Sequence, residues 1–279
     1  MIDLLIANGL VVDGTGRPAY MADVAISGQR ILNVGDLSHV DAARTIDATG
    51  MVISPGFIDI HTHSDLSLLV EPWGLSKVRQ GVTTEVSGNC GYSPFPVASE
   101  TAGALREMMS GLFGEDVDWM WSDLDGYRQF AAQRGLGMNI APLVGHSAIR
   151  GAVVGFADRK ATKVEVGAMQ RLIAEAMEQG AYGLSTGLTL PPSAYGDTDE
   201  VVALAEAMAP YSDRFYTSHI RAWAGYHIKG VAEAIEIGQR AKVPVQVSHM
   251  AVNDPPYWGQ ADRVIAVCED AVAAGLDVT

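Results

Sequence analysis

The stretch Pro55–Asp65, PGFIDIHTHSD, ends an apolar extended run with two histidines one residue apart. Side chains alternate along a strand, so Asp59, His61 and His63 are predicted to share one face of it. If the strand belongs to a barrel, one face lines the lumen, and the two imidazoles then lie side by side at its mouth, where one metal ion can be held. For this motif alone, two solvated loop histidines are the alternative.

The rest of the chain after Pro55 alternates apolar strand-like runs with amphipathic helical stretches, which is typical of βα units on a parallel sheet. The strand-like runs are GFIDIHTH (56–63), VTTEVSGNC (82–90), MNIAPLVGH (138–146), AYGLSTG (181–187), RFYTSHI (214–220), VPVQVSHM (243–250) and LDVT (276–279). This pattern predicts an α/β fold, a metal-dependent (β/α)8 TIM-like barrel whose catalytic groups gather at the C-terminal strand ends. We expect the barrel, residues 55–279, to be incomplete, with its eighth strand beyond Thr279.

Residues 1–54 are predicted as the N-terminal part of a small β domain of the sandwich type. Short strand-like runs are broken there by turn signals at Asn8-Gly9, Asp13-Gly14 and Ser27-Gly28. Farther along the chain, Thr198 is the expected N-cap of a helix that carries Asp199 and Glu200 in its first turn.

Three further residues with metal-binding side chains fall at the ends of predicted barrel strands: Cys90, His219 and His249. Together with His61 and His63 they are predicted to meet at one edge of the sheet. A thiolate and two neutral imidazoles bind Zn²⁺ and leave a fourth position for water, which is the pattern of a catalytic zinc site. We therefore expect Zn²⁺ as the cofactor.

Composition excludes several classes of protein. The net charge is −14 and basic clusters are absent, so nucleic acid is not an expected partner. The first residues lack a basic leader, and no apolar run approaches eighteen residues, so we expect neither secretion nor a membrane partner. Only Cys90 and Cys268 are cysteines, which suits a reduced, cytoplasmic protein. Cys268 is expected to be structural, and His39 and His227 to be surface residues.

Several motifs together resemble the amidohydrolase superfamily, and within it the N-acyl-D-amino-acid deacylase (D-aminoacylase) family. They are PGFIDIHTHSD, SKVRQGVTTEVSGNCGYSP, LVGH, GAYGLSTGL, DTDEVVALA, YTSHIR and VPVQVSHM. The resemblance implies a zinc-dependent hydrolase of linear amides that acts on small N-acylated substrates. It implies that Cys90, His219 and His249 hold a tightly bound zinc and that His61 and His63 share Cys90 in a second, weaker site. The family's catalytic aspartate comes from the eighth strand, so no catalytic residue is assigned here.

Two departures from the family's pattern concern the substrate. The acidic R-D-E-G type of sequence after the fifth-strand histidine reads RAWAG here, and the lysine after the sixth-strand histidine is replaced by Ala251. Arg221 is the candidate to bind a substrate carboxylate instead, with solvation of a helix N-terminus or a surface ion pair as its alternatives. His146 is a candidate for substrate or second-layer contact, with a purely structural role equally open. A homo-oligomer is left open.

Two other functions are weighed against the deacylase. A cyclic amidase of the hydantoinase or dihydroorotase kind shares the barrel, but it bridges two metals with a carboxylated lysine from the fourth strand, and AYGLSTG contains no lysine. A non-catalytic protein with the amidohydrolase fold is the third possibility. Such a protein is expected to lose ligands, whereas this sequence keeps all five candidates.

Overall fold

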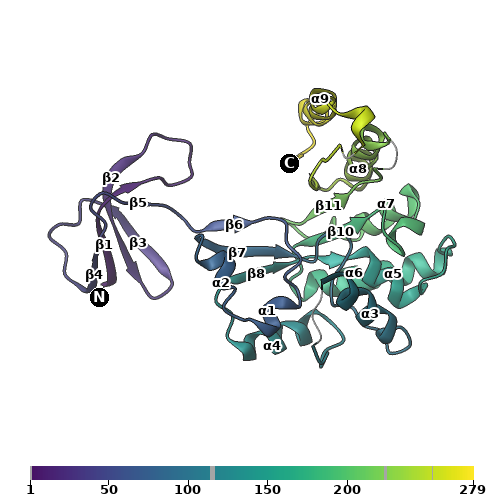
Figure 1. The fold of residues 1–279 in the computed structure, drawn as a ribbon, viewed down its shortest axis with the longest axis horizontal. Coiled ribbons are helices and arrows are strands. Elements are labelled where there is room, and N and C mark those ends of the chain that lie inside the picture. The colour runs from purple at the N-terminus through teal and green to yellow at the C-terminus, as the bar shows by residue number, and fades with distance from the viewer. Residues whose placement is uncertain (1, 114–116, 223–224, 253) are drawn as a thin grey trace. The chain divides into compact units, whose positions relative to one another are not determined.

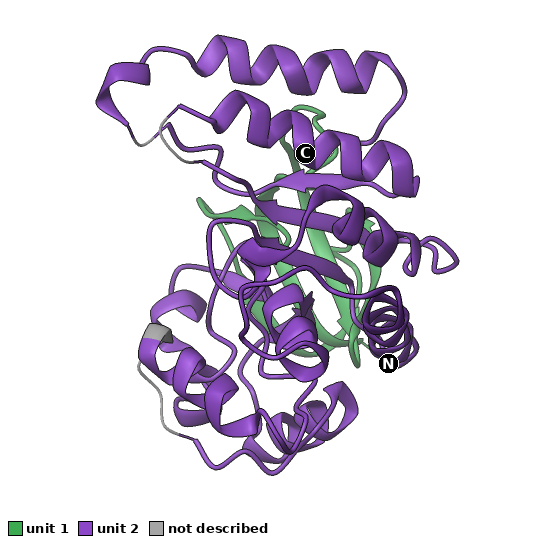
Figure 2. Ribbon diagram, turned by 90° about the vertical axis from the view of Figure 1, so that its right-hand side faces the viewer, with its two compact units in different colours: residues 1–57 green, residues 58–279 purple. Residues whose placement is uncertain are grey.

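The computed structural model describes residues 2–113, 117–222, 225–252 and 254–279. They form two compact units, Met1–Phe57 and Ile58–Thr279, coloured separately in Figure 2. We predicted the domain boundary after residue 54, and the boundary between the compact units lies after Phe57 in the chain. Among the described residues, no helix is both long enough and apolar enough to cross a bilayer.

The first unit is a single sheet (Figure 1). Its strands are β1 (Ile2–Val11), β2 (Tyr20–Ser27), β3 (Arg30–Gly35), β4 (Ala42–Asp47) and β5 (Val52–Ile53), in the order β3-β2-β1-β4, with β5 also paired to β1. The β1–β2 and β2–β3 pairs are antiparallel, whereas β4 and β5 run parallel to β1.

One predicted turn in this unit is wrong. Asn8-Gly9 does not end a strand, because β1 continues through it with a shift of register against β2 between Ile6 and Gly9. Asn8 has a φ of 63°, and its backbone N–H donates to the carboxylate of Asp23 at 2.7 Å. The dipeptide therefore forms a β-bulge, in which an asparagine tolerates the left-handed conformation. Gly28, with a φ of 55°, does form the predicted turn between β2 and β3.

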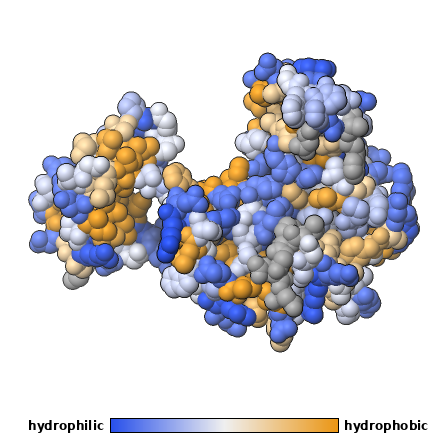
Figure 3. All heavy atoms as spheres, in the orientation of Figure 1, coloured by the Kyte–Doolittle hydropathy of each residue, from blue (hydrophilic) through white to orange (hydrophobic). Residues whose placement is uncertain are grey.

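The first unit buries little of its apolar surface. Its buried hydrophobic side chains form two small clusters, around Leu5 and around Val24. Met21, Ile31 and several other large apolar side chains are exposed, and Figure 3 shows apolar residues gathered on the face of this unit turned to the viewer. The hydrophobic core of the protein therefore lies mainly in the second unit.

The second unit contains parallel strands in sequential order. One sheet has the order β6-β7-β8 and the other β12-β11-β10-β9. Their bounds are β6 (Phe57–Asp59), β7 (Val82–Ser87), β8 (Asn139–Pro142), β9 (Val144–Gly145), β10 (Gly183–Gly187), β11 (Phe215–His219) and β12 (Val245–Val247). Only Leu143 separates β8 from β9, so this stretch of chain pairs with β7 through its first part and with β10 through its second. The seventh predicted strand, 276–279, is reduced to a parallel bridge between Val278 and Val245.

Helices occupy the connections between these strands, as Figure 1 shows. They are α1 (Ser67–Val70), α2 (Leu75–Val78), α3 (Ala102–Phe113), α4 (Leu124–Arg134), α5 (His146–Val153), α6 (Lys163–Glu178), α7 (Thr198–Glu206), α8 (His227–Ala241) and α9 (Ala261–Ala273), with short 3₁₀ turns η1 (Ser193–Tyr195) and η2 (Pro255–Tyr257). α6 is one of the expected amphipathic helices, and Thr162 begins it with a complete capping box to Glu165. Strand, helix and parallel strand follow one another, which makes this unit α/β.

Two local predictions are corrected here. The N-cap of α7 is Asp197, whose carboxylate accepts from the N–H of Glu200 at 3.0 Å, and Thr198 is the first helical residue. A carboxylate reaches the orphan N–H groups of a first turn at least as well as a hydroxyl does. His227 is buried instead of lying on the surface, because its ring packs edge-on against Tyr257 at 5.8 Å between centroids.

Candidate metal centre

The C-terminal ends of the parallel strands bring the predicted ligands together. In the pairing of β10 with β11, Gly187 lies opposite His219, and in that of β11 with β12, Ser218 lies opposite Val247. His219 therefore ends β11 beside the end of β10, and His249 follows β12 at the same edge of the sheet. Cys90 lies in the turn that follows β7.

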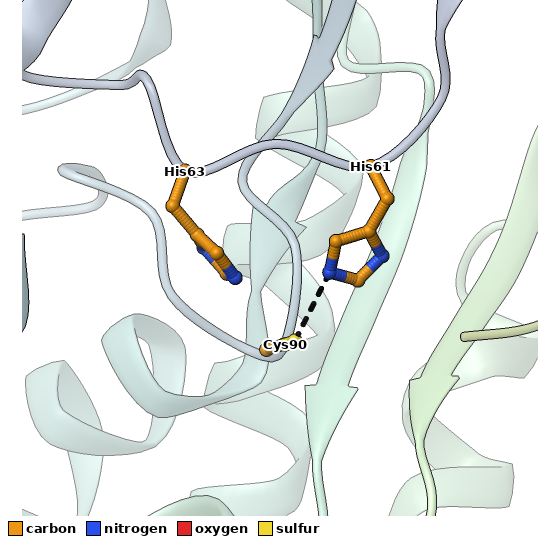
Figure 4. A group of neighbouring side chains, drawn as sticks. All are labelled: His61, His63 and Cys90. Carbon is orange, nitrogen blue, oxygen red and sulfur yellow. Dashed lines mark hydrogen bonds between the residues drawn. The ribbon is translucent and has the colours of Figure 1, made fainter. Parts of the chain in front are cut away.

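His61 and His63 reach the same place by a route that differs from the predicted one. β6 ends at Asp59, so both histidines lie after the strand, and strand alternation does not set their direction. Their rings nevertheless lie edge to face, with centroids 5.4 Å apart. Figure 4 shows both rings directed toward Cys90, and the dashed line joins the thiol to His61.

The donor atoms of the five residues are close enough to share metal ions. Cys90 Sγ lies 3.4 Å from His61 Nε2 and 3.5 Å from His249 Nε2. The ligand atoms of His61, His63 and Cys90 all lie within 4.8 Å of one another, and so do those of Cys90, His219 and His249. Cys90 belongs to both groups. The geometry therefore describes two adjacent ligand sets that share one sulfur.

The spacing fits zinc. Zinc bonds to nitrogen and sulfur are about 2.0–2.3 Å long, so two ligands of one tetrahedral ion lie about 3.5 Å apart. The two distances from Cys90 Sγ match this value. In addition, His219 Nδ1 is buried and has no hydrogen-bond partner among the described residues. A buried imidazole nitrogen without a partner is costly unless a ligand satisfies it.

Burial sets the protonation of the donors. Desolvation, with neighbouring imidazoles as a further cause, lowers the pKa of His63 and of His219 to about 4. The pKa of His61 and of His249 is lowered as well, mainly by desolvation. Burial raises the pKa of the Cys90 thiol to about 12. The imidazoles are therefore neutral at pH 7, the form that binds a metal.

The backbone around Cys90 is unusual. Cys90 has a φ of 54° and His249 a φ of 44°, left-handed values that few residues other than glycine adopt. The turn also packs tightly against β10, because a Cβ atom on Gly187 would overlap the carbonyl oxygen of Cys90. Such strain persists only where the surrounding structure enforces it, which is common at binding sites.

Two acids near His61 and His63 form ion pairs with a lysine, and a third acid is buried. Asp59 accepts from the ammonium of Lys77 at 2.9 Å, and Glu85 pairs with the same ammonium at 2.8 Å. Asp65 is buried, and desolvation raises its pKa to about 7. No geometry here singles out a general base.

Arg221 is committed to contacts within the protein. Its Nε lies 3.1 and 3.0 Å from the two carboxylate oxygens of Glu233, and its terminal nitrogens donate to the carbonyl oxygens of Leu188, Ala194 and Gly196. Arg221 also lines a cavity of about 520 Å³ beside Tyr226 and Lys229, but none of the five candidate ligands lines it. These contacts favour a structural role, in which Arg221 forms a largely buried ion pair with Glu233 instead of the expected surface pair.

His146 is fully buried at the start of α5. Its Nδ1 lies 2.8 Å from the hydroxyl of Ser193, and its Nε2 lies 3.0 Å from a carboxylate oxygen of Glu200. Arg150 lies 3.4 Å from the same oxygen. Because both ring nitrogens are engaged, His146 has no atom left for a substrate, and the geometry favours its structural role.

Two hydroxyls that contact the ligand set were not found from the sequence. Ser185 bonds to the turn that carries Cys90, and Thr189 bonds to His219. Both belong to the motif GAYGLSTGLTL, in which neither spacing nor residue type distinguishes these two hydroxyls from Thr186. Only their hydrogen bonds in the folded chain identify them.

Known proteins resemble this chain in sequence and in fold. Residues 44–277 match the amidohydrolase family. D-aminoacylase of Alcaligenes xylosoxydans xylosoxydans is 36% identical over 97% of this chain and 55% of its own length, so the chain spans about half the length of that relative. The structure of N-acyl-D-glutamate deacylase from Bordetella bronchiseptica, complexed with zinc and a phosphonate inhibitor, is 33% identical and superposes with a TM-score of 0.92 over 100% of this chain and 57% of that one. L-hydantoinase from Arthrobacter aurescens, 16% identical with a TM-score of 0.60 over 100% of this chain and 57% of its own, shares the fold.

Proposed function

Since this chain belongs to the amidohydrolase family, we propose that the protein is a zinc-dependent hydrolase that cleaves the linear amide bond of N-acyl-D-amino acids or related N-acyl compounds. The observation that carries the proposal is the convergence of Cys90, His219 and His249, with donor atoms within 4.8 Å of one another. The 36% identity to D-aminoacylase supports the choice of substrate class.

The metal roles are part of the proposal. Cys90, His219 and His249 hold the tightly bound zinc, and His61 and His63 form a second, weaker site with the same cysteine. When bound, zinc supplies Lewis-acid activation of water and of the amide carbonyl. The chain's own contribution is to keep four imidazoles neutral and to hold one thiol at the meeting point of both ligand sets.

The architecture belongs to the same proposal. Sequential parallel strands with helices in their connections are the local pattern of a (β/α)8 barrel, and the ligands lie at the C-terminal strand ends, where such barrels carry their sites. The division into a small β domain and a barrel stays our prediction, as does a cytoplasmic location, and a homo-oligomer stays open. We assign the general base to no residue of this chain.

Substrate binding is left with fewer candidates than the sequence offered. The guanidinium of Arg221 already has Glu233 and three carbonyl oxygens as partners. The position that carries a lysine in the family is Ala251. We therefore propose that the substrate carboxylate is not bound through His146 or Arg221.

Zinc content tests the metal assignment. We expect about one zinc per chain by plasma mass spectrometry, and loss of that zinc in Cys90→Ala and in His249→Ala. Cys268→Ala is the matched control, because this second cysteine lies outside both ligand sets. Equal zinc in Cys90→Ala and in the parent protein would refute the assignment.

Substrate assays separate the deacylase from the cyclic amidase and from a non-catalytic protein. Release of acetate from N-acetyl-D-amino acids is expected, and hydrolysis of dihydrouracil is not. β10 offers serine and threonine side chains and no lysine to bridge two metals. The assays need a protein that includes the expected eighth strand, because the family's catalytic aspartate comes from it. In that protein, turnover of dihydrouracil alone would favour the cyclic amidase, and zinc binding without turnover of either substrate would favour the non-catalytic protein.

A further inference from the structure

β10 contributes no residue to the proposed ligand set, yet it lies beside β11, whose last residue is His219. A hydroxyl group of this strand contacts the backbone on both sides of Cys90, and a hydroxyl group of the residues that follow it contacts the ring of His219. In metal sites, groups that hydrogen-bond to ligands fix their direction and the nitrogen they present. The contact of Thr189 with His219 is of this kind, and Ser185 acts on Cys90 through the backbone on either side of it.

Ser185 bridges the two ends of the turn that carries Cys90. Its hydroxyl oxygen accepts from the N–H of Gly91 at 3.0 Å, and its hydroxyl donates to the carbonyl oxygen of Gly88. These two residues enclose Asn89 and Cys90. Ser185 is fully buried, so no water competes for its hydrogen bonds. One side chain thus closes the turn in which Cys90 adopts its left-handed backbone conformation.

Thr189 holds the ring of His219. Its Oγ1 lies 2.6 Å from His219 Nε2, while the N–H of Leu188 donates to the carbonyl oxygen of His219 at 2.9 Å. If Nε2 carries the proton and donates it to Thr189, then Nδ1 presents its lone pair. Nδ1 is the buried nitrogen that has no hydrogen-bond partner among the described residues.

We propose that Ser185 and Thr189 are positioning residues of the metal centre. Ser185 fixes the turn that carries Cys90, and Thr189 fixes the ring of His219 with Nδ1 turned to the metal. The proposal rests on the proposed function, because it assumes that Cys90 and His219 bind zinc. It gives β10 a role in the site although the strand supplies no ligand.

Thr189→Val tests the second half of the proposal. Valine keeps the shape of threonine and removes the acceptor for His219, so we expect zinc affinity, measured by competition with a chromogenic chelator, to fall about 10–100-fold. Thr189→Ser restores the hydroxyl and is expected to bind zinc nearly as the parent does. Unchanged affinity in Thr189→Val would overturn this role.

Ser185→Ala tests the first half by a spectroscopic signal. With Co²⁺ in place of zinc, a cysteine ligand gives a sulfur-to-cobalt charge-transfer absorption, and we expect Ser185→Ala to weaken that band. An unchanged band would overturn the role of Ser185. If Ser185→Ala does not fold, judged by urea unfolding of the metal-free protein, Thr189→Val still decides whether the segment that follows β10 positions a ligand.

Thr186→Val is the matched control for both variants. Thr186 is a buried residue of the same strand, and its hydroxyl contacts Tyr216 and Ser218 and not the cysteine turn. We expect it to lose stability and to keep zinc affinity and the cobalt band. An equal loss of affinity in Thr186→Val would refute a specific role for Thr189. A parent chain that binds no zinc would instead refute the proposed function, and this inference with it.

Discussion

Replacing Gly187 with alanine tests whether β10 holds the cysteine turn by close packing. A Cβ atom at this position would overlap the carbonyl oxygen of Cys90 and lie 3.2 Å from Cδ1 of Leu190. Carbon atoms pack at about 3.5–4.0 Å, and the overlap with the carbonyl oxygen is tighter than the contact with Leu190. We therefore expect the turn that carries Cys90 to move by about 1 Å away from β10. Gly187 is not among the positive-φ glycines, so the effect of alanine is steric and not conformational.

The expected magnitude has two parts. Forcing an extra carbon into a packed interior costs about 1–3 kcal/mol of unfolding free energy. A shift of about 1 Å is also large against a zinc–sulfur bond of about 2.3 Å. We therefore expect zinc affinity to fall at least about tenfold, which corresponds to about 1.4 kcal/mol of binding free energy. Urea unfolding of the metal-free protein and chelator competition measure the two quantities separately.

Two glycine controls separate the site from general packing. On Gly183, at the other end of β10, a Cβ would overlap the carbonyl oxygen of Phe215, so Gly183→Ala is expected to lose stability and to keep zinc affinity. Gly167, in α6, has open space around it, and Gly167→Ala is expected to gain about 0.4–1 kcal/mol. Parent-like zinc affinity in Gly187→Ala would show that close packing against β10 does not hold the cysteine turn. An equal loss of affinity in Gly183→Ala would show the same.

Three further predictions follow from the same structure. Burial acts to raise the pKa of Glu200, but the hydrogen bond to His146 and the charges of His146 and Arg150 lower it more, so its folded pKa lies below 4.5. The stability that this carboxylate contributes is therefore present above pH 4.5 and is lost as the pH falls through the lowered folded pKa. Urea unfolding should show that Glu200→Gln loses less unfolding free energy than the parent between pH 5 and 3. Equal losses in the two proteins would contradict this. A lysine at position 221 cannot reproduce the contacts that the guanidinium of Arg221 makes with Glu233 and the carbonyl groups. For Arg221→Lys we therefore expect a loss of about 1–3 kcal/mol in unfolding free energy and an unchanged KM. A raised KM at the stability of the parent would instead favour a role in binding the substrate. Zinc at 100 times its Kd should raise the unfolding free energy by about 2.7 kcal/mol, and a chelator should reverse this; Cys90→Ala should respond to neither.

The family and the alternation of strands and helices can be predicted from the sequence. The motifs from PGFIDIHTHSD to VPVQVSHM predict the amidohydrolase family, which the match over residues 44–277 confirms. The alternation of amphipathic stretches with strand-like runs predicts helices in the connections, because a helix with one buried face repeats that face in its sequence. Parallel strands then bring Cys90, His219 and His249 to one edge, because parallel pairing aligns their C-terminal ends.

The contacts that hold the ligand residues in place can be seen only in the tertiary structure. β6 stops at Asp59, so the positions of His61 and His63 come from loop packing, which has no period in the sequence. Arg221 and His146 look available in the sequence. They prove to be engaged by Glu233 of the helix that follows Arg221 and by Glu200, which lies 54 positions from His146. Conversely, Ser185 and Thr189 are ordinary hydroxyl residues until the fold sets them against Gly91 and His219. Local patterns record which face of an element is buried, but a hydrogen bond between residues 94 or 30 positions apart leaves no local trace, and only the folded chain brings its two ends within 3 Å.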